Sequence, residues 1–102
     1  MKVLGRVKLE RFWKRHRTVE KHLRAWLTEV SVAGWNTPDD LLVSYPRARV
    51  LDGVRVLFNI KGNHYRLLTD IDYPQRTVLI QFVGTHAQYD DIDAKTYGRA
   101  KH

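Results

Sequence analysis

Residues 54–72 read VRVLFNIKGNHYRLLTDID, and this stretch decides the fold. Apolar side chains recur at every second position on both sides of Gly62-Asn63, a dipeptide typical of a tight β-hairpin turn. The pattern therefore predicts an antiparallel hairpin with one face packed on a core. A turn centred on this dipeptide would set Asn59 opposite Arg66.

The alternation assigns the hairpin side chains to two faces. We expect the core face to hold Val54, Val56, Phe58, Ile60, Tyr65, Leu67, Thr69 and Ile71. The outer face would carry Arg55, Leu57, Asn59, Lys61, His64, Arg66 and Leu68. A polar outer face is often ordinary solvated surface, and that interpretation stays open. No acid precedes Asp70 on this face, so we expect its cations to be unpaired across the strands, and a bound anion would relieve their repulsion.

The remaining chain predicts helices before the hairpin and short strands around it. Apolar spacing indicates helices over residues 6–16 and 19–32, the second capped by Thr18 and stopped near Gly34. Thr37-Pro38 predicts a short third helix ending at residue 43 or 44. Further strands are expected at residues 2–4, 47–51 and 77–83, and the three tryptophans are expected in the core. The polar tail from Asp90 would form a short helix or fray.

These elements predict an α+β fold. Two N-terminal helices would pack on one face of a small antiparallel sheet of three to five strands arranged as a meander. The chain is 43% hydrophobic, enough for one core, and we expect a single domain over residues 1–102.

Positive charge is concentrated in the first third of the chain. The protein carries 18 Lys/Arg against 11 Asp/Glu, a net charge of +7. Residues 1–30 hold nine Lys/Arg and three Asp/Glu, so a net charge of +6 lies there. Such a patch attracts polyanions, of which nucleic acid is the commonest, although a merely basic soluble protein would show the same composition.

Residue content excludes several kinds of site. The chain has no cysteine, so disulfides, zinc–thiolate sites and thiol nucleophiles are excluded. Charged residues interrupt the apolar positions near residue 1, and no apolar run approaches the length of a membrane span. We therefore expect a cytoplasmic protein with no membrane contact.

A second polar cluster follows the third long strand, in FVGTHAQYD at residues 82–90. In a meander this strand pairs with the hairpin, so His86 and Tyr89 would lie beside the outer face. Histidine and tyrosine transfer protons, and together with Lys and Arg they could support metal-free RNA cleavage through the 2′-hydroxyl. A capping or packed histidine and a core tyrosine remain the alternative. The histidines show no metal-ligand spacing, so we expect no metal and no cofactor.

Two segments carry a resemblance to a known family, FNIKGNHYRL at residues 58–67 and FVGTHAQYD. With the upstream LERFWKRH, LRAWLTEV, GWNTPDDL and YPRARVL, they resemble the HigB toxins, which are RelE-like toxins of bacterial type II toxin–antitoxin modules. The resemblance covers about residues 4–96. It implies a ribosome-dependent, metal-independent endoribonuclease that cuts mRNA in the A site of the 70S ribosome, close to rRNA. It also implies a HigA-type helix-turn-helix antitoxin and a bacterial cytoplasmic location.

Carried over by position, the resemblance implies a set of site residues. The expected catalytic residues are Lys61 and Arg66, as cations for the phosphate, and His86 and Tyr89, for proton transfer or base stacking. The expected RNA-binding residues near the hairpin are Asn59, Asn63, His64 and Asp90, and Asn63 would also serve the turn.

The basic residues of the two helices are a separate expectation that rests on their charge, because no run of acids offsets them. We expect contacts to rRNA phosphates from Lys8, Arg11, Lys14, Arg15, Arg17, Lys21 and Arg24, with Lys8, Arg11 and Arg15 as the RNA-binding residues of the first helix. A solvated helix face remains the alternative.

Two other functions stay open at this point. A basic α+β domain could bind RNA or an acidic partner without performing chemistry. A toxin homologue could have lost catalysis while retaining antitoxin binding.

Overall fold

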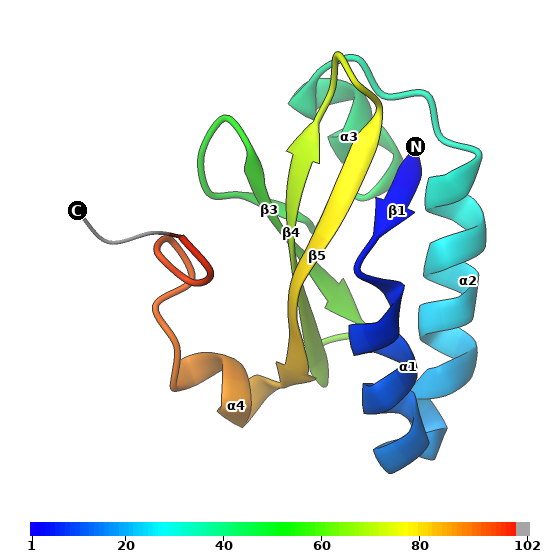
Figure 1. The fold of residues 1–102 in the computed structure, drawn as a ribbon, viewed down its shortest axis with the longest axis vertical. Coiled ribbons are helices and arrows are strands. Elements are labelled where there is room, and N and C mark those ends of the chain that lie inside the picture. The colour runs from blue at the N-terminus through cyan, green and yellow to red at the C-terminus, as the bar shows by residue number, and fades with distance from the viewer. Residues whose placement is uncertain (100–102) are drawn as a thin grey trace.

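The computed structural model describes residues 1–99, whose strands form a single sheet with the helices packed around it (Figure 1). The elements in chain order are β1 (Lys2–Leu4), α1 (Arg6–Arg15), the 3₁₀ helix η1 (Arg17–Val19), α2 (Glu20–Ser31), α3 (Pro38–Ser44), β2 (Arg49–Val50), β3 (Arg55–Ile60), β4 (Tyr65–Asp72), β5 (Thr77–Thr85) and α4 (His86–Asp90). The strand order across the sheet is β1-β5-β4-β3-β2. Helices α1 and α2 lie on one side of the sheet, and α4 lies on the other side.

The α+β architecture with two N-terminal helices on one face is as expected. The sheet is mixed rather than wholly antiparallel, because β1 pairs parallel to β5 while the other neighbours pair antiparallel. The parallel pair spans only Lys2–Leu4 against Thr77–Leu79, so the second half of β5 has no strand beside it on that side.

The predicted register of the hairpin is confirmed. Asn59 pairs with Arg66, and Ile60 with Tyr65. The core-face assignment also holds along the paired strands, and Val54 is its exception. Val54 lies before β3 and is 47% exposed, because the strand begins one residue later.

The core lies between the sheet and the helices. Its helical part consists of Leu9 and Trp13 from α1 and Leu23, Trp26, Leu27 and Val30 from α2. Trp26 meets Phe58 of β3 edge to face, with ring centroids 5.3 Å apart, a favourable arrangement of aromatic quadrupoles. All three tryptophans are buried, as expected. Within residues 1–99, none of the helices combines the length and the apolar character needed to cross a bilayer.

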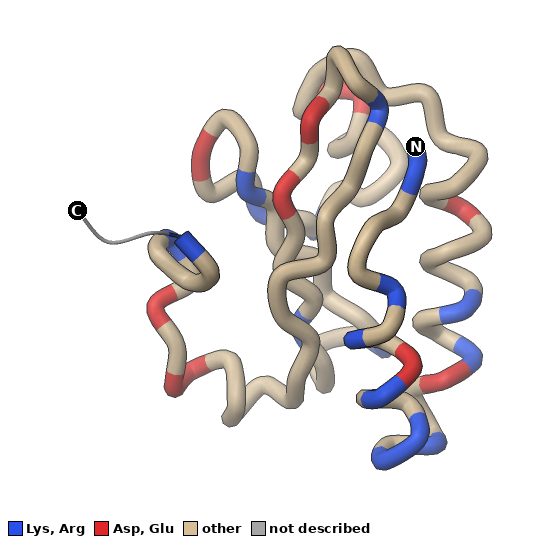
Figure 2. Tube along the Cα trace, viewed as in Figure 1, with Lys and Arg blue, Asp and Glu red and all other residues tan. Residues whose placement is uncertain are grey.

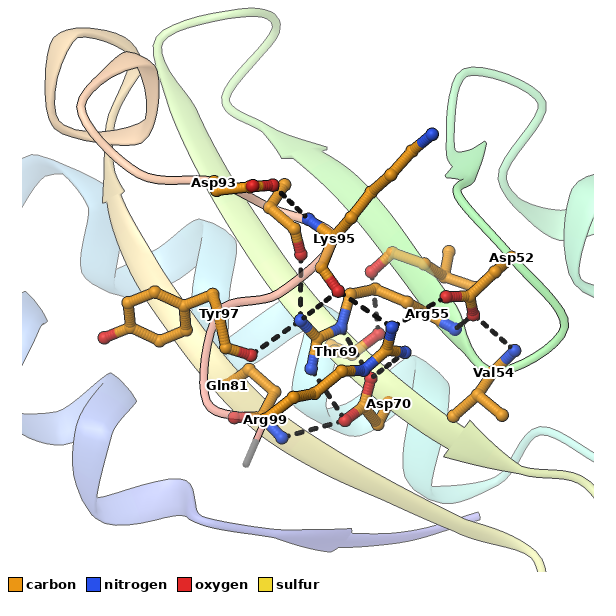
Figure 3. A network of polar contacts seen from close by, with 12 residues as sticks. Asp52, Val54, Arg55, Thr69, Asp70, Gln81, Asp93, Lys95, Tyr97 and Arg99 are labelled. Carbon is orange, nitrogen blue, oxygen red and sulfur yellow. Dashed lines mark hydrogen bonds and ion pairs between the residues drawn. The ribbon is translucent and has the colours of Figure 1, made fainter. Parts of the chain in front are cut away.

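The outer face of the sheet is covered, which the alternation pattern did not predict. Leu57 and Leu68 are buried there, and Arg55 has no exposed surface. The segment after α4 runs back across this face, and its backbone carbonyls accept hydrogen bonds from the Arg55 guanidinium (Figure 3). The expectation that no cation on this face is paired is therefore wrong for Arg55.

Arg55 binds both a carboxylate and the returning chain. Its Nε and Nη2 donate to the two oxygens of Asp70 at 2.8 and 2.9 Å, a bidentate pair across β3 and β4. Its Nη1 donates to the carbonyl oxygens of Ala94 and Tyr97 at 2.8 and 2.6 Å. Arg99 adds a 3.0 Å ion pair to Asp52. The network fixes the position of residues 94–99 on the sheet.

Of the two helix N-caps expected from the sequence, Thr37 is confirmed and Thr18 is wrong. Thr37 caps α3 as predicted, because its hydroxyl accepts from the Asp40 N–H at 3.2 Å. Thr18 is not a cap, since α2 begins at Glu20 after the turn of η1 and its N-cap position, Val19, makes no side-chain cap. The second helix ends at Ser31, ahead of Gly34.

The two threonines make a matched pair for measuring cap energetics. Thr37→Ala should lower the free energy of unfolding by about 1 kcal/mol, because it leaves an N–H of the first turn of α3 without its partner. Thr18→Ala should change it by less than about 0.5 kcal/mol, the range of ordinary surface substitutions. Urea unfolding at pH 7 measures both. Equal losses would contradict the cap assignment.

The Arg55–Asp70 pair should make stability depend on pH in acid. Burial alone would raise the pKa of Asp70, but hydrogen bonds from Arg55 and Gln81 and the charges of Arg55 and Arg99 hold it below the ordinary value of 3.8. A carboxylate with a lowered pKa contributes stability above pH 3.8 and loses it as the pH falls through the folded pKa. Asp70→Asn should therefore cost about 3 kcal/mol at pH 7 and flatten the decline below pH 4.

Urea unfolding between pH 7 and pH 2.5 tests this expectation. Asp91→Asn is the matched control, because Asp91 is exposed and makes no ion pair within residues 1–99. If Asp70→Asn behaves like Asp91→Asn at pH 7, the pair does not hold the outer face.

Candidate active site

The β3–β4 turn directs Lys61 away from the outer face. Lys61 has φ 53° and Gly62 has φ 65°, so the left-handed positions fall one residue earlier than Gly62-Asn63. The His64 N–H closes the turn on the Lys61 carbonyl at 3.3 Å. A non-glycine residue at positive φ breaks the alternation of the strand. The Lys61 side chain accordingly lines a cavity shared with η1 and α2 on the helix side.

This cavity is strongly basic. It has a volume of about 690 Å³, and its cationic lining residues are Arg17, Lys21, Arg24 and Lys61, with His22 beside them. Arg24 is engaged already, by a 2.8 Å ion pair to Glu20 and by lying over the Trp13 ring. Arg17, Lys21 and Lys61 have no carboxylate partner within residues 1–99. Figure 2 shows the Lys and Arg positions gathered where α1 and α2 meet.

Arg66 occupies the sheet face opposite to this cavity. It is an outer-face residue of β4 and lies between Asn59 of β3 and Gly84 of β5, its partners in register. Arg66 is only 8% exposed. Its Nη1 donates to the Asn63 carbonyl at 3.1 Å. Within residues 1–99 no carboxylate forms an ion pair with this guanidinium, so its positive charge is available to an anionic ligand.

The start of α4 is tied to the hairpin turn. Thr85 caps α4, and Gln88 returns the contact to the Thr85 N–H, which makes a full capping box. The first N–H of the helix, from His86, is left free by this box and donates to the His64 carbonyl at 3.1 Å. His64 and His86, which lie 22 residues apart in the sequence, are thereby joined through the backbone.

Three polar side chains share one side of α4. His86, Tyr89 and Asp90 stand at positions i, i+3 and i+4, which face the same way on a helix. The His86 Nδ1 lies 3.1 Å from the Asp90 Oδ2. A carboxylate at Nδ1 holds the imidazole in one orientation and leaves Nε2 free to accept or donate a proton. Both side chains are at least half exposed, so the dyad is open to a ligand.

Tyr89 and Asp90 differ in surroundings. Tyr89 is half-buried, with its ring 6.5 Å from that of Phe82 on β5. Asp90, which is also expected to bind RNA, is the partner of His86. The spacing of four residues within the segment HAQYD is the signal that could have revealed this pair.

Gly84 allows close packing between the two parts of this region. A Cβ at Gly84 would lie 2.6 Å from the Phe82 Cζ and 2.9 Å from the Gln88 Oε1. The residue is buried opposite Arg66, so a side chain there would displace either the Phe82 ring or the capping box of α4.

The other expected RNA-binding residues are spread over two further places. The Asn59 amide donates to the Arg47 carbonyl at 3.4 Å and lines a 320 Å³ pocket beside Tyr45. Lys8, Arg11 and Arg15 line a separate groove of about 320 Å³ between α1 and β5. Lys8 is partly committed there, because its Nζ donates to the Gln81 carbonyl at 3.0 Å.

The structure thus brings Arg66, His64, His86, Tyr89 and Asp90 together at one end of the sheet, while Lys61 faces the basic cavity around the turn. Sequence reasoning missed His22 and the rings of Phe82 and Tyr97. Among residues 1–99 no three His, Asp or Glu side chains are grouped in a way that could hold a metal ion. The chemistry available to these residues is proton transfer beside a cation.

Comparison with protein families gives one match. A family model described as the RelE-like toxic component of a toxin–antitoxin system, HigB toxin, matches residues 19–92, which is more than half of the chain. The matched region includes the hairpin, β5 and α4 but not α1. A search of curated proteins found no match.

Proposed function

Because this chain belongs to the HigB family of RelE-like toxins of toxin–antitoxin systems, we propose that it cleaves mRNA on the ribosome. RelE-like toxins are generally mRNA-cleaving endoribonucleases. The observation that carries the proposal is the His86–Asp90 dyad at 3.1 Å, with its backbone bonded to the hairpin turn beside a buried Arg66 that has no carboxylate partner among residues 1–99.

The proposed reaction needs no metal ion. The 2′-oxygen attacks the adjacent phosphorus and loses its proton to a base, the bond from phosphorus to the 5′-oxygen breaks, and that oxygen takes a proton from an acid. The products are a 2′,3′-cyclic phosphate and a 5′-hydroxyl end. His86, oriented by Asp90, moves a proton at Nε2, and Tyr89 supplies the second proton-transfer group or stacks on a base. Arg66 stabilises the charge that develops on the phosphate oxygens.

The basic cavity supports a separate task in the same function. Arg17, Lys21 and Lys61 would bind RNA phosphates, because cations clustered on a surface attract polyanions. We propose that these phosphates belong to rRNA and that Lys61 acts mainly by binding, with the chemistry carried by residues on the opposite face. A HigA-type antitoxin is the proposed regulatory partner.

Substitutions at the dyad should separate its members. His86→Ala should lower the cleavage rate about 10²- to 10⁴-fold, the usual contribution of a general acid or base. Asp90→Asn should lower it less, because the imidazole remains but loses its charged partner. Asp91→Asn is the matched control, since it removes the neighbouring carboxylate, and it should cleave like wild type. Mapping of new 5′-hydroxyl mRNA ends after induction, with growth curves, measures these effects.

Arg66→Lys and Arg66→Ala should both abolish growth arrest, because a lysine cannot reproduce the guanidinium geometry on a phosphate. Thermal unfolding of each variant checks that this buried position still folds. If the wild-type protein arrests growth and no new mRNA ends appear, the protein blocks translation by binding and does not cleave mRNA. Ends that persist in Arg66→Ala and His86→Ala would show that the catalytic residues lie elsewhere.

The basic cavity predicts a salt-dependent effect on binding. Lys61→Ala and Lys21→Ala should each weaken association with 70S ribosomes and reduce the slope of log K against log salt by about 0.9. At saturating ribosome concentration, both should keep most of the cleavage rate that His86→Ala loses. Co-sedimentation with ribosomes at several salt concentrations measures the slope. A Lys61→Ala variant that binds normally and fails to cleave would return Lys61 to the catalytic group.

A further inference from the structure

A groove of about 320 Å³ runs between α1 and the second half of β5. It exists because β1 pairs only as far as Leu4 with Leu79, after which the chain leaves the sheet and enters α1. Helix α1 then lies beside the part of β5 that lacks a strand neighbour. The Lys8 Nζ donates to the Gln81 carbonyl at 3.0 Å and so joins the two walls of the groove.

Three aromatic rings line this groove. They are Phe12 of α1, Phe82 of β5 and Tyr97 of the returning segment, and each is half-buried. The Phe82 and Tyr97 rings meet edge to face with centroids 5.5 Å apart. Phe12 stacks on His16 at 4.2 Å. Tyr97 is held through its carbonyl by the buried Arg55, so the ring stays in the groove wall. Fixed, partly exposed rings are surfaces on which unpaired bases stack.

The charge around the groove has one sign. Arg11 and Arg15 line it from α1, both are exposed, and neither has a carboxylate partner within residues 1–99. Among the residues that the structure describes, no Asp or Glu lines this groove. Cations next to aromatic rings are chemically complementary to a single nucleic-acid strand, in which phosphates alternate with bases.

We propose that this groove binds a single-stranded RNA segment, with phosphates on Arg11 and Arg15 and a base on the Tyr97–Phe82 rings. The proposal deepens the proposed function, on which it rests, by assigning a binding subsite for mRNA beside the cleaved bond. Continuity supports it, because Phe82 contacts Tyr97 in the groove and Tyr89 in the candidate active site. Double-stranded RNA does not fit the geometry, since its bases are already stacked.

Fluorescence anisotropy with a labelled 2′-O-methyl hexaribonucleotide tests the proposal, because the methyl group blocks cleavage. Tyr97→Leu should weaken binding about 5- to 150-fold, the range for losing one stacked base, and Tyr97→Phe should restore it. Arg11→Ala/Arg15→Ala should weaken binding and reduce the salt slope by about 1.4, corresponding to two phosphates of a single strand. Arg6→Ala/Lys14→Ala is the matched control, because it removes the same charge from α1 outside this groove.

Several outcomes would overturn the assignment. One is a wild-type protein that does not bind the hexamer at 50 mM salt. Another is an equal loss in the two double variants, which would show that net charge alone acts. If the groove variants lose affinity for an octaglutamate peptide and retain wild-type affinity for the hexamer, the groove binds an acidic protein segment. If the hexamer annealed to its complement loses as much affinity with Tyr97→Leu as the single strand does, stacking is not the cause.

Cleavage assays keep the two proposals distinguishable. Tyr97→Leu should raise the mRNA concentration needed for half-maximal cleavage and leave the maximal rate close to wild type. His86→Ala should lower the maximal rate and leave that concentration close to wild type. Normal oligonucleotide binding by the groove variants, with cleavage lost in His86→Ala, would overturn the groove alone. Hexamer binding that depends on Tyr97, in a protein that cuts no mRNA, would overturn the proposed function alone.

Discussion

The buried guanidinium of Arg55 is the constraint on which the outer half of this protein depends. Removing a permanent charge from water is costly unless its donors are all satisfied. Asp70 supplies the counter-charge, and the carbonyls of residues 94–97 accept the remaining bonds. Arg55 can therefore be buried only when the chain after α4 lies back on the sheet. The position of Tyr97, and through it the packing around Phe82, follows from this requirement.

Two backbone hydrogen-bonding groups then connect the covered sheet to the candidate active site. The capping box of Thr85 and Gln88 leaves the His86 N–H available, and the His64 carbonyl at the hairpin turn accepts it. The turn and α4 consequently hold each other in place. A site made of short loops gains rigidity in this way, which matters because proton transfer depends on sub-ångström placement of the donor and acceptor.

The sequence was sufficient for the hairpin register and insufficient for what covers it. The turn expected at Gly62-Asn63 predicted that Asn59 would pair with Arg66, and period-two alternation agreed, since a one-residue slip would bury the wrong face. The covering segment shows no apolar periodicity, and Arg55 binds its backbone carbonyls, which any residue provides. The left-handed φ of Lys61 could not be read either, because the Gly-Asn dipeptide suggested a turn one residue later. The position of His86 beside the hairpin was predictable from strand order, whereas the cavity around Lys61 required knowledge of how η1 lies against the turn.

Both outer strands of the sheet are short or shielded. On one side β2 has two residues, Arg49 and Val50, and both are exposed. On the other side β1 has three residues, and Lys8 occupies the Gln81 carbonyl of β5 beyond it. Long unpaired strand edges are templates for intermolecular β-pairing and aggregation. Within residues 1–99, the second half of β5 lacks a strand neighbour on one side, but helix α1 lies beside it and Lys8 binds the Gln81 carbonyl there. A partner protein that added a strand at this edge would therefore have to displace Lys8 from β5, whereas a partner that reads side chains would not.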